Sequence, residues 1–184
     1  MEFLVELWLP IVVSGVAVFM MSALNWTALP THKTEFSGFS NDEAVGAALR
    51  SGAGAPGRYV TPNIMGGAGN TPEGKAKLER GPLAYVTIAP PGAPNMGKMM
   101  GLSLLSAILI SAFVAYIASN AVAADASYLH VFRITGTVTF MAYALGTISE
   151  SIWFARPWKS QLLNAFDALL YAGITGGVFG WLWS

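Results

Sequence analysis

A glycine-rich stretch in the first half of the chain has the spacing of a phosphate-binding P-loop. Residues 69–76 read GNTPEGKA, with the two glycines and the lysine of that motif at the right distances. A P-loop joins a buried strand to a helix and ends in Ser or Thr, whereas Ala76 follows here and the preceding NIMGGAG is not a hydrophobic strand. Pro72 also removes one backbone N–H from the loop. We therefore expect no nucleotide to bind at this stretch.

A carboxylate inside an apolar stretch is a second candidate for chemistry. Asp167 lies about seven residues inside the apolar stretch 161–183, which corresponds to about 10 Å along a helix. In a membrane, a charge at that depth is costly unless it is paired, hydrated or protonated, and it is a functional candidate by default. The residues that share its helix face, at spacings of three or four, are Asn164, Tyr171 and Thr175.

Two interpretations of this polar face stay open. In the first, the four residues form an intramembrane polar seam that hydrogen-bonds to a neighbouring helix, with Tyr143, Thr147 or Ser149 as candidate partners. In the second, Asp167 titrates as part of a proton or ion relay. The sequence offers no second acidic residue at a matching depth, and we therefore favour the seam.

The same apolar stretch carries a row of small residues spaced by four. The row consists of Ala168, Ala172, Gly176 and Gly180. Small residues let the backbones of two helices approach closely, which is how apolar helices associate in lipid. The row predicts tight helix packing, with a partner that lies either in this chain or in another.

Charges and histidines near the ends of the apolar stretches offer little further chemistry. Glu6 and Arg133 lie at a similar depth, and we expect both to be interfacial charges, with Arg133 extending to the membrane surface. His32 and His130 are expected on opposite sides of the membrane and so cannot share one haem. The chain has no cysteine and no Ser–His–Asp, H-E-x-x-H or paired-carboxylate pattern. We expect no cofactor, no metal and no enzyme activity.

The overall composition indicates what must position these residues. Hydrophobic residues make up 54% of the 184 residues and charged residues 11%, whereas soluble domains have about 25% charged residues. The formal net charge of +0 gives no electrostatic case for a nucleic-acid partner. The composition therefore predicts a membrane protein.

Four apolar stretches are long enough to cross a bilayer as helices. They cover residues 3–24, 99–123, 131–153 and 161–183. Each contains the roughly 20 residues that a membrane-spanning helix needs. We predict an all-α membrane protein, with the first transmembrane helix in 1–24 and the other three in 99–184.

The basic residues predict an orientation. Most of them lie between the first and second stretches, and Arg156 and Lys159 lie between the third and fourth. The positive-inside rule places both of these loops in the cytoplasm and both termini in the periplasm of a bacterial inner membrane. Tryptophans near the ends of the stretches are typical of an aromatic belt at the membrane surface.

Residues 25–98 form the predicted cytoplasmic loop region, which is rich in Gly and Pro. The capping-box spacing of Ser40 and Glu43 predicts a short helix at about 41–50. The stretch AYVTIA at 84–89 predicts a strand. We expect the rest to be irregular apart from a turn at AKLE, with too few large apolar residues for a strong core.

Three stretches resemble a family of small bacterial multi-pass membrane proteins. They read MEFLVELWLPIVVSGVAVF, GPLAYVTIAPPGAPNMGK and VFRITGTVTFMAYALGTISESIWFARPW. That family has no assigned activity. The resemblance therefore implies a topology and a bacterial source, but no functional residue.

The sequence as a whole favours a non-catalytic accessory or structural subunit of a larger bacterial membrane complex, with a respiratory or photosynthetic complex as a candidate host. The expected partners are the lipid bilayer and other membrane protein subunits, with no nucleic acid and no nucleotide. The alternative is a small oligomeric transporter or channel that uses Asp167.

Overall fold

The computed structural model describes residues 2–183, and these residues are mostly helical. Four helices are long and apolar enough to cross a membrane by length and composition. Three of them are α2 (Trp8–Thr27), α5 (Met96–Ala121) and α8 (Trp158–Leu182). The fourth, Tyr128–Trp153, is built from α6 (Tyr128–Ala144), the 3-10 turn η3 (Leu145–Thr147) and α7 (Ile148–Trp153).

The first helix begins later than the sequence predicts. A short helix α1 (Phe3–Glu6) comes first, the backbone leaves the helical conformation at Leu7, and α2 begins at Trp8. Pro10 explains the interruption, because its ring would clash with the carbonyl four residues earlier, at Glu6, if the helix were continuous. In the first turn of α2 the missing N–H of Pro10 costs nothing.

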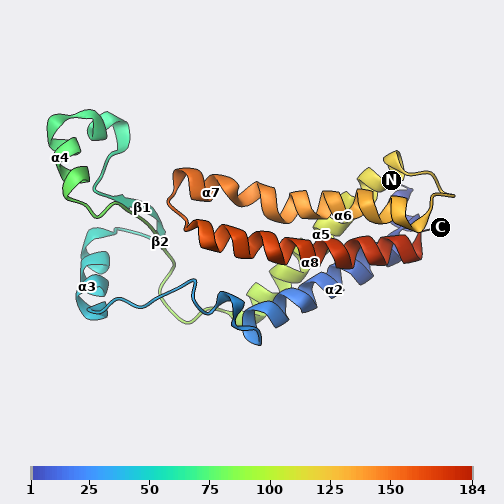
Figure 1. The fold of residues 1–184 in the computed structure, drawn as a ribbon. Coiled ribbons are helices and arrows are strands. Elements are labelled where there is room, and N and C mark those ends of the chain that lie inside the picture. Colours follow the sequence, from blue (N-terminus) through green and yellow to red (C-terminus); the bar gives the residue numbers. More distant parts are fainter. Residues whose placement is uncertain (1, 184) are drawn as a thin grey trace. The chain divides into compact units, whose positions relative to one another are not determined.

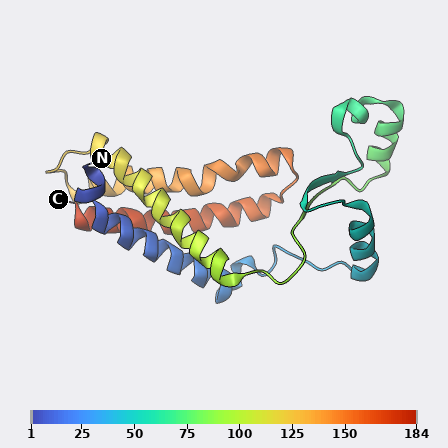
Figure 2. The same ribbon diagram turned by 180° about the vertical axis from the view of Figure 1, so that it is seen from behind.

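The four long helices form a ring in which each contacts two neighbours. The most extensive contact is between α6 and α8, α2 packs on both α5 and α8, and α5 also contacts α6 (Figures 1 and 2). Buried apolar residues fill the ring near the chain ends, among them Ile11, Val114, Val131 and Phe179. This core stabilises the end of the bundle at which the two chain ends lie.

Small residues set the distance between α6 and α8. A Cβ added at Gly176 would lie 2.9 Å from Cδ2 of Phe132 and 3.0 Å from its carbonyl oxygen. At Gly180 it would lie 2.7 Å from Cδ2 of Tyr128. Ala168 is fully buried and Ala172 nearly so. The row of small residues on α8 therefore faces α6 of the same chain.

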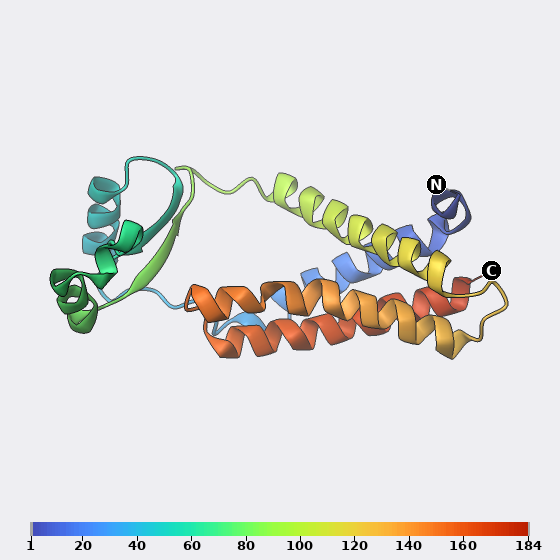
Figure 3. The ribbon, with the colours of Figure 1, turned by 90° about the horizontal axis from the view of Figure 1, so that it is seen from above.

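The helices α2 and α5 cross at Gly15. A Cβ there would lie 2.9 Å from the Cα of Ile108, and the hydroxyl of Ser14 donates a 3.1 Å hydrogen bond to the hydroxyl of Ser111 beside the crossing. Figure 3 shows the two helices diverging towards the end of α2 and the start of α5. Side chains of both helices line a pocket between these parts.

Residues 36–93 and 153–155 form a second unit. Its elements are α3 (Asp42–Gly52), β1 (Gly57–Thr61), η2 (Met65–Asn70), α4 (Pro72–Arg80) and β2 (Ala84–Ile88). The two strands pair in an antiparallel hairpin in which Tyr59 lies opposite Val86, and the guanidinium of Arg58 lies 4.5 Å from the ring centre of Phe154. Every residue from 36 to 93 is described, and none is buried.

Three details of this unit correct the sequence predictions. Strand β1 falls in a stretch that we expected to be irregular. The sequence of so short a stretch does not show that it will pair with β2. Asn41, not Ser40, caps α3, and its Oδ1 accepts from the N–H of Ala44 at 3.1 Å. The expected turn at AKLE is part of a nine-residue helix, α4, because Pro72 and the capping Thr71 start that helix earlier.

The stretch with P-loop spacing lies at the start of α4. Its second glycine, Gly74, is in the first helical turn, and its N–H donates to the Thr71 hydroxyl at 3.0 Å. A Cβ added at Gly74 would lie 2.0 Å from the carbonyl oxygen of Ala68, so the glycine serves close packing of η2 on α4. The 3-10 turn η2 precedes this helix, where a P-loop has a buried strand.

Candidate functional site

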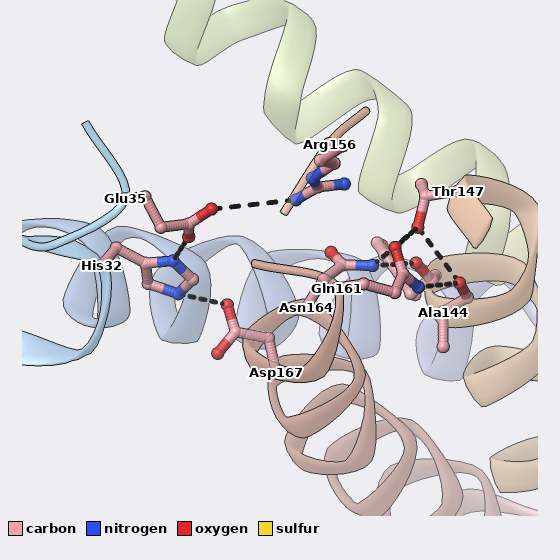
Figure 4. Close-up of polar contacts among 9 residues, drawn as sticks. His32, Glu35, Ala144, Thr147, Arg156, Gln161, Asn164 and Asp167 are labelled. Carbon is pink, nitrogen blue, oxygen red and sulfur yellow. Dashed lines mark hydrogen bonds and ion pairs between the residues drawn. The ribbon is translucent and has the colours of Figure 1, made fainter. Parts of the chain in front are cut away.

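Asp167 is buried among partners from two other segments of the chain. Asp167 is 4% exposed, and its Oδ1 accepts a hydrogen bond from Nδ2 of Asn25 at 2.9 Å. Its Oδ2 lies 2.9 Å from Nε2 of His32 and 3.5 Å from the hydroxyl of Tyr171, one turn further along α8. Figure 4 shows the carboxylate of Asp167 directed at the ring of His32. The carboxylate is therefore held from three directions.

His32 connects Asp167 to a second carboxylate. Its Nδ1 forms an ion pair with Glu35, whose side chain is 7% exposed. The other oxygen of Glu35 lies 3.9 Å from Nη2 of Arg156, whose side chain is 32% exposed. Acidic and basic side chains thus alternate from the buried Asp167, through His32 and Glu35, to the partly exposed Arg156 (Figure 4). We call these four residues the acid–histidine chain.

Opposite charges within the acid–histidine chain stabilise the charged form of His32. Burial alone would lower the pKa of His32, but hydrogen bonds and charge interactions with Glu35 and Asp167 outweigh it and raise this pKa above 6.5. Burial alone would raise the pKa of Glu35, but His32, Ser160 and Arg156 outweigh it and lower this pKa below 4.5. With both groups charged, His32 and Glu35 form a buried ion pair.

Local sequence explains how His32 reaches α8. The helix α2 ends at Thr27, and Leu29 is extended, as expected for a residue before proline. Pro30 then starts the 3-10 turn η1 (Pro30–His32), which contacts both α2 and α8. The ring of Trp26 stacks on the ring of His32, with 4.2 Å between centroids and 11° between planes. The turn and the stacking together fix the imidazole beside Asp167.

A second polar cluster lies where α6 gives way to η3. Nδ2 of Asn164 donates to the carbonyl of Tyr143 and to the hydroxyl of Thr147, both at 3.0 Å. Nε2 of Gln161 donates to the carbonyl of Ala144 at 3.0 Å (Figure 4). The regular helix ends at Ala144, and side chains of α8 therefore satisfy carbonyls that the interruption leaves free. This cluster ties the 3-10 interruption of the third long helix to α8.

Three residues of the polar seam proposed from the sequence are distributed over these two clusters: Asp167 and Tyr171 belong to the first and Asn164 to the second. Asp167, Tyr171 and Thr175 are buried, and Asn164 is partly buried. Tyr143 and Thr147, two of the candidate partners, bind Asn164 and not Asp167. The partners of Asp167 are Asn25 and His32, which sequence reasoning missed. The usable signal was that both follow the first apolar stretch, on the same predicted side of the membrane as the nearer end of α8.

The other candidates from the sequence lie apart from these clusters. Glu6 and Arg133 are both exposed, and within residues 2–183 Arg133 makes no ion pair with Glu6 or Asp125. His130 is exposed at the start of α6. Among the described residues, no group of three His, Asp or Glu side chains is arranged to hold a metal ion.

The acid–histidine chain can hold and move a proton. Imidazole accepts a proton at one nitrogen and releases one from the other, and His32 has a carboxylate at each. The same contacts also serve as a clamp, because they tie the segment after α2 to α8 across two buried carboxylates. Comparison with protein-family models, with characterised proteins and with solved structures found no match for this chain.

Proposed function

We propose that the protein is a bacterial inner-membrane protein that crosses the bilayer four times, with residues 25–98 in the cytoplasm and both termini in the periplasm. Four helices of sufficient length and apolar character support the crossing, and the distribution of basic residues supports the direction. The chain has no cysteine, so single introduced cysteines can report the topology without background.

The topology test compares Gly54→Cys in the second unit with Asp125→Cys between α5 and α6. Both positions are exposed. In intact bacterial cells we expect a thiol reagent that cannot cross membranes to label the cysteine at 125 and to leave the one at 54 unlabelled. Labelling of position 54 in intact cells, or recovery of the protein from the aqueous fraction after an alkaline wash, would overturn this topology.

Within the membrane, we propose a role as an accessory or structural subunit of a larger complex. The observation that carries this proposal is the exposure of large apolar side chains outside the four long helices. Phe36 is 82% exposed, Met65 70% and Phe39 67%, in a unit that buries no residue. In the proposed topology lipid tails do not cover these side chains, and contact with a partner protein would remove them from water.

Mild-detergent extraction of the native protein tests this role. We expect the wild-type chain to migrate as part of a large complex and a Phe36→Ser/Phe39→Ser variant to be released from it. Lys75→Ser, an exposed substitution in the same unit, serves as the control and should leave the complex intact. Wild-type protein that is monomeric in several mild detergents would refute the subunit role. Mass spectrometry of the co-purifying chains would identify the host.

A second function, proton or ion transport, is favoured by one specific observation. The acid–histidine chain joins the buried Asp167 to the partly exposed Arg156 through groups that accept and release protons. In vesicles loaded with a pH-sensitive dye, transport predicts a flux that Asp167→Asn abolishes while assembly is unchanged. Absence of flux from the wild type, together with loss of assembly in Asp167→Asn, would leave the clamp as the role of this residue.

A further inference from the structure

A pocket of about 350 Å³ opens between the diverging parts of α2 and α5. It begins about one helical turn beyond the crossing at Gly15, on the side that leads to the acid–histidine chain. Its apolar lining comes from Val18, Phe19, Leu102 and Ala107. Its polar lining comes from Ser22, Ser103, Ser106, Tyr143 and Tyr171. Side chains from all four long helices thus meet in one space.

The burial of the lining residues shows that the pocket runs from the bundle surface to its core. Leu102 is 55% exposed, and Ser103 and Ser106 on the same helix are also exposed. Val18 and Tyr171, at the other side of the pocket, are buried. In the proposed topology the open side lies in the cytoplasmic half of the bilayer, so a ligand would enter from the lipid.

The lining also restricts the chemistry of a ligand. Five lining residues carry hydroxyl groups, which both donate and accept hydrogen bonds, and none of the lining residues is charged. A phosphate or an ammonium group placed here would lose its hydration without gaining an opposite charge. A neutral group with carbonyl or hydroxyl oxygens would instead find donors and acceptors on an otherwise apolar wall. The volume lies at the lower end for small-molecule sites, which suits a single ring or a short polar head.

We propose that this pocket binds the head of a neutral membrane amphipath, a ring with carbonyl or hydroxyl groups on a hydrocarbon tail, the chemical class that includes isoprenoid quinones. The tail leaves past Leu102 towards the lipid. Tyr171 links the site to the acid–histidine chain, since its ring lines the pocket and its hydroxyl lies 3.5 Å from Oδ2 of Asp167. The proposal rests on insertion in a membrane, but it requires neither the subunit role nor transport.

The test uses the full-length protein in detergent and a benzoquinone with a saturated alkyl chain as the probe. Binding is measured by equilibrium dialysis for the wild type, Ser106→Phe and Ser119→Phe. Both serines are exposed on α5, but the pocket is lined by Ser106 and not by Ser119. Filling the pocket with a phenyl ring is expected to weaken binding by about tenfold or more, while Ser119→Phe binds like the wild type.

Variants that remove only a hydroxyl keep the test informative if Ser106→Phe does not fold. Tyr171→Phe and Tyr143→Phe are expected to weaken binding by about three- to tenfold, since each removes one hydrogen bond. Tyr116→Phe on the exposed side of α5 is the control and should bind normally. Equal binding by all variants, or no binding to the wild type, would overturn the proposal. Displacement of the quinone by an anionic phospholipid, but not by a neutral diacylglycerol, would overturn the neutral ligand class.

Discussion

Gly176→Ala is expected to destabilise the bundle although it favours the helix locally. The added methyl group would lie 3.0 Å from the carbonyl oxygen of Phe132 and 2.9 Å from its ring. The ring can rotate, but the carbonyl belongs to the backbone of α6, so the two helices must separate by a few tenths of an ångström. Such overpacking costs about 1–3 kcal/mol, and replacing a helical glycine by alanine contributes about 0.5–1 kcal/mol in the opposite direction. We expect the free energy of unfolding to fall by about 1 kcal/mol.

Gly173→Ala on the same helix is the matched control. Gly173 is exposed, and a Cβ added there would meet no atom within 4 Å, so only the gain in helix propensity remains. We expect this variant to be slightly more stable than the wild type, and the two variants to differ by about 2 kcal/mol. Reversible unfolding in mixed micelles of increasing denaturing-detergent content measures both. Equal shifts for the two glycines would refute the inference that contact with Phe132 limits the approach of α6 and α8.

Two further predictions concern the polar clusters. The charged form of His32 stabilises the fold below pH 6.5, and this contribution is lost as the pH rises through the raised pKa of the folded state. The thermal midpoint of the wild type should therefore decrease as the pH is raised through this pKa. The midpoint of His32→Gln should not show this decrease, whereas the exposed-site control His130→Gln should behave like the wild type. Asn164→Leu leaves the carbonyl of Tyr143 without this donor and should cost about 1–3 kcal/mol in unfolding free energy. Asn120→Leu on the exposed face of α5 should change stability little. Similar losses from the two asparagine variants would contradict the importance of the hydrogen bonds at η3.

The long helices could be predicted from the sequence because length and apolar composition alone decide whether a helix can cross a bilayer. The interruptions were harder to predict. The one at Leu7 follows from Pro10, whereas the one at η3 occurs without proline and depends on amide side chains of α8 that bind the free carbonyls. Strand β1 depends in the same way on a partner strand more than twenty positions away.

The candidate site shows the same limit. Asp167 could be recognised because a carboxylate inside an apolar stretch stands out against its neighbours. Its partners could not, because Asn25 and His32 are separated from it by 142 and 135 positions. His32 also lies in a 3-10 turn, where no periodic pattern shows which way a side chain points. The depth of a residue in a predicted membrane span can be predicted from the sequence around it, whereas the identity of its partner depends on how the helices assemble.

The stacking of Trp26 on His32 provides a built-in optical reporter. Indole emission is quenched by a protonated imidazole in contact with it, and the two rings are 4.2 Å apart and nearly parallel. The indole is 51% exposed while the imidazole beneath it is buried, so a fluorophore at the surface reads the ionisation of a group in the interior. Subtracting the spectrum of Trp26→Phe isolates that signal from the other tryptophans. The emission of Trp26 is thus expected to change as His32 gains or loses its proton, and this change needs no added dye.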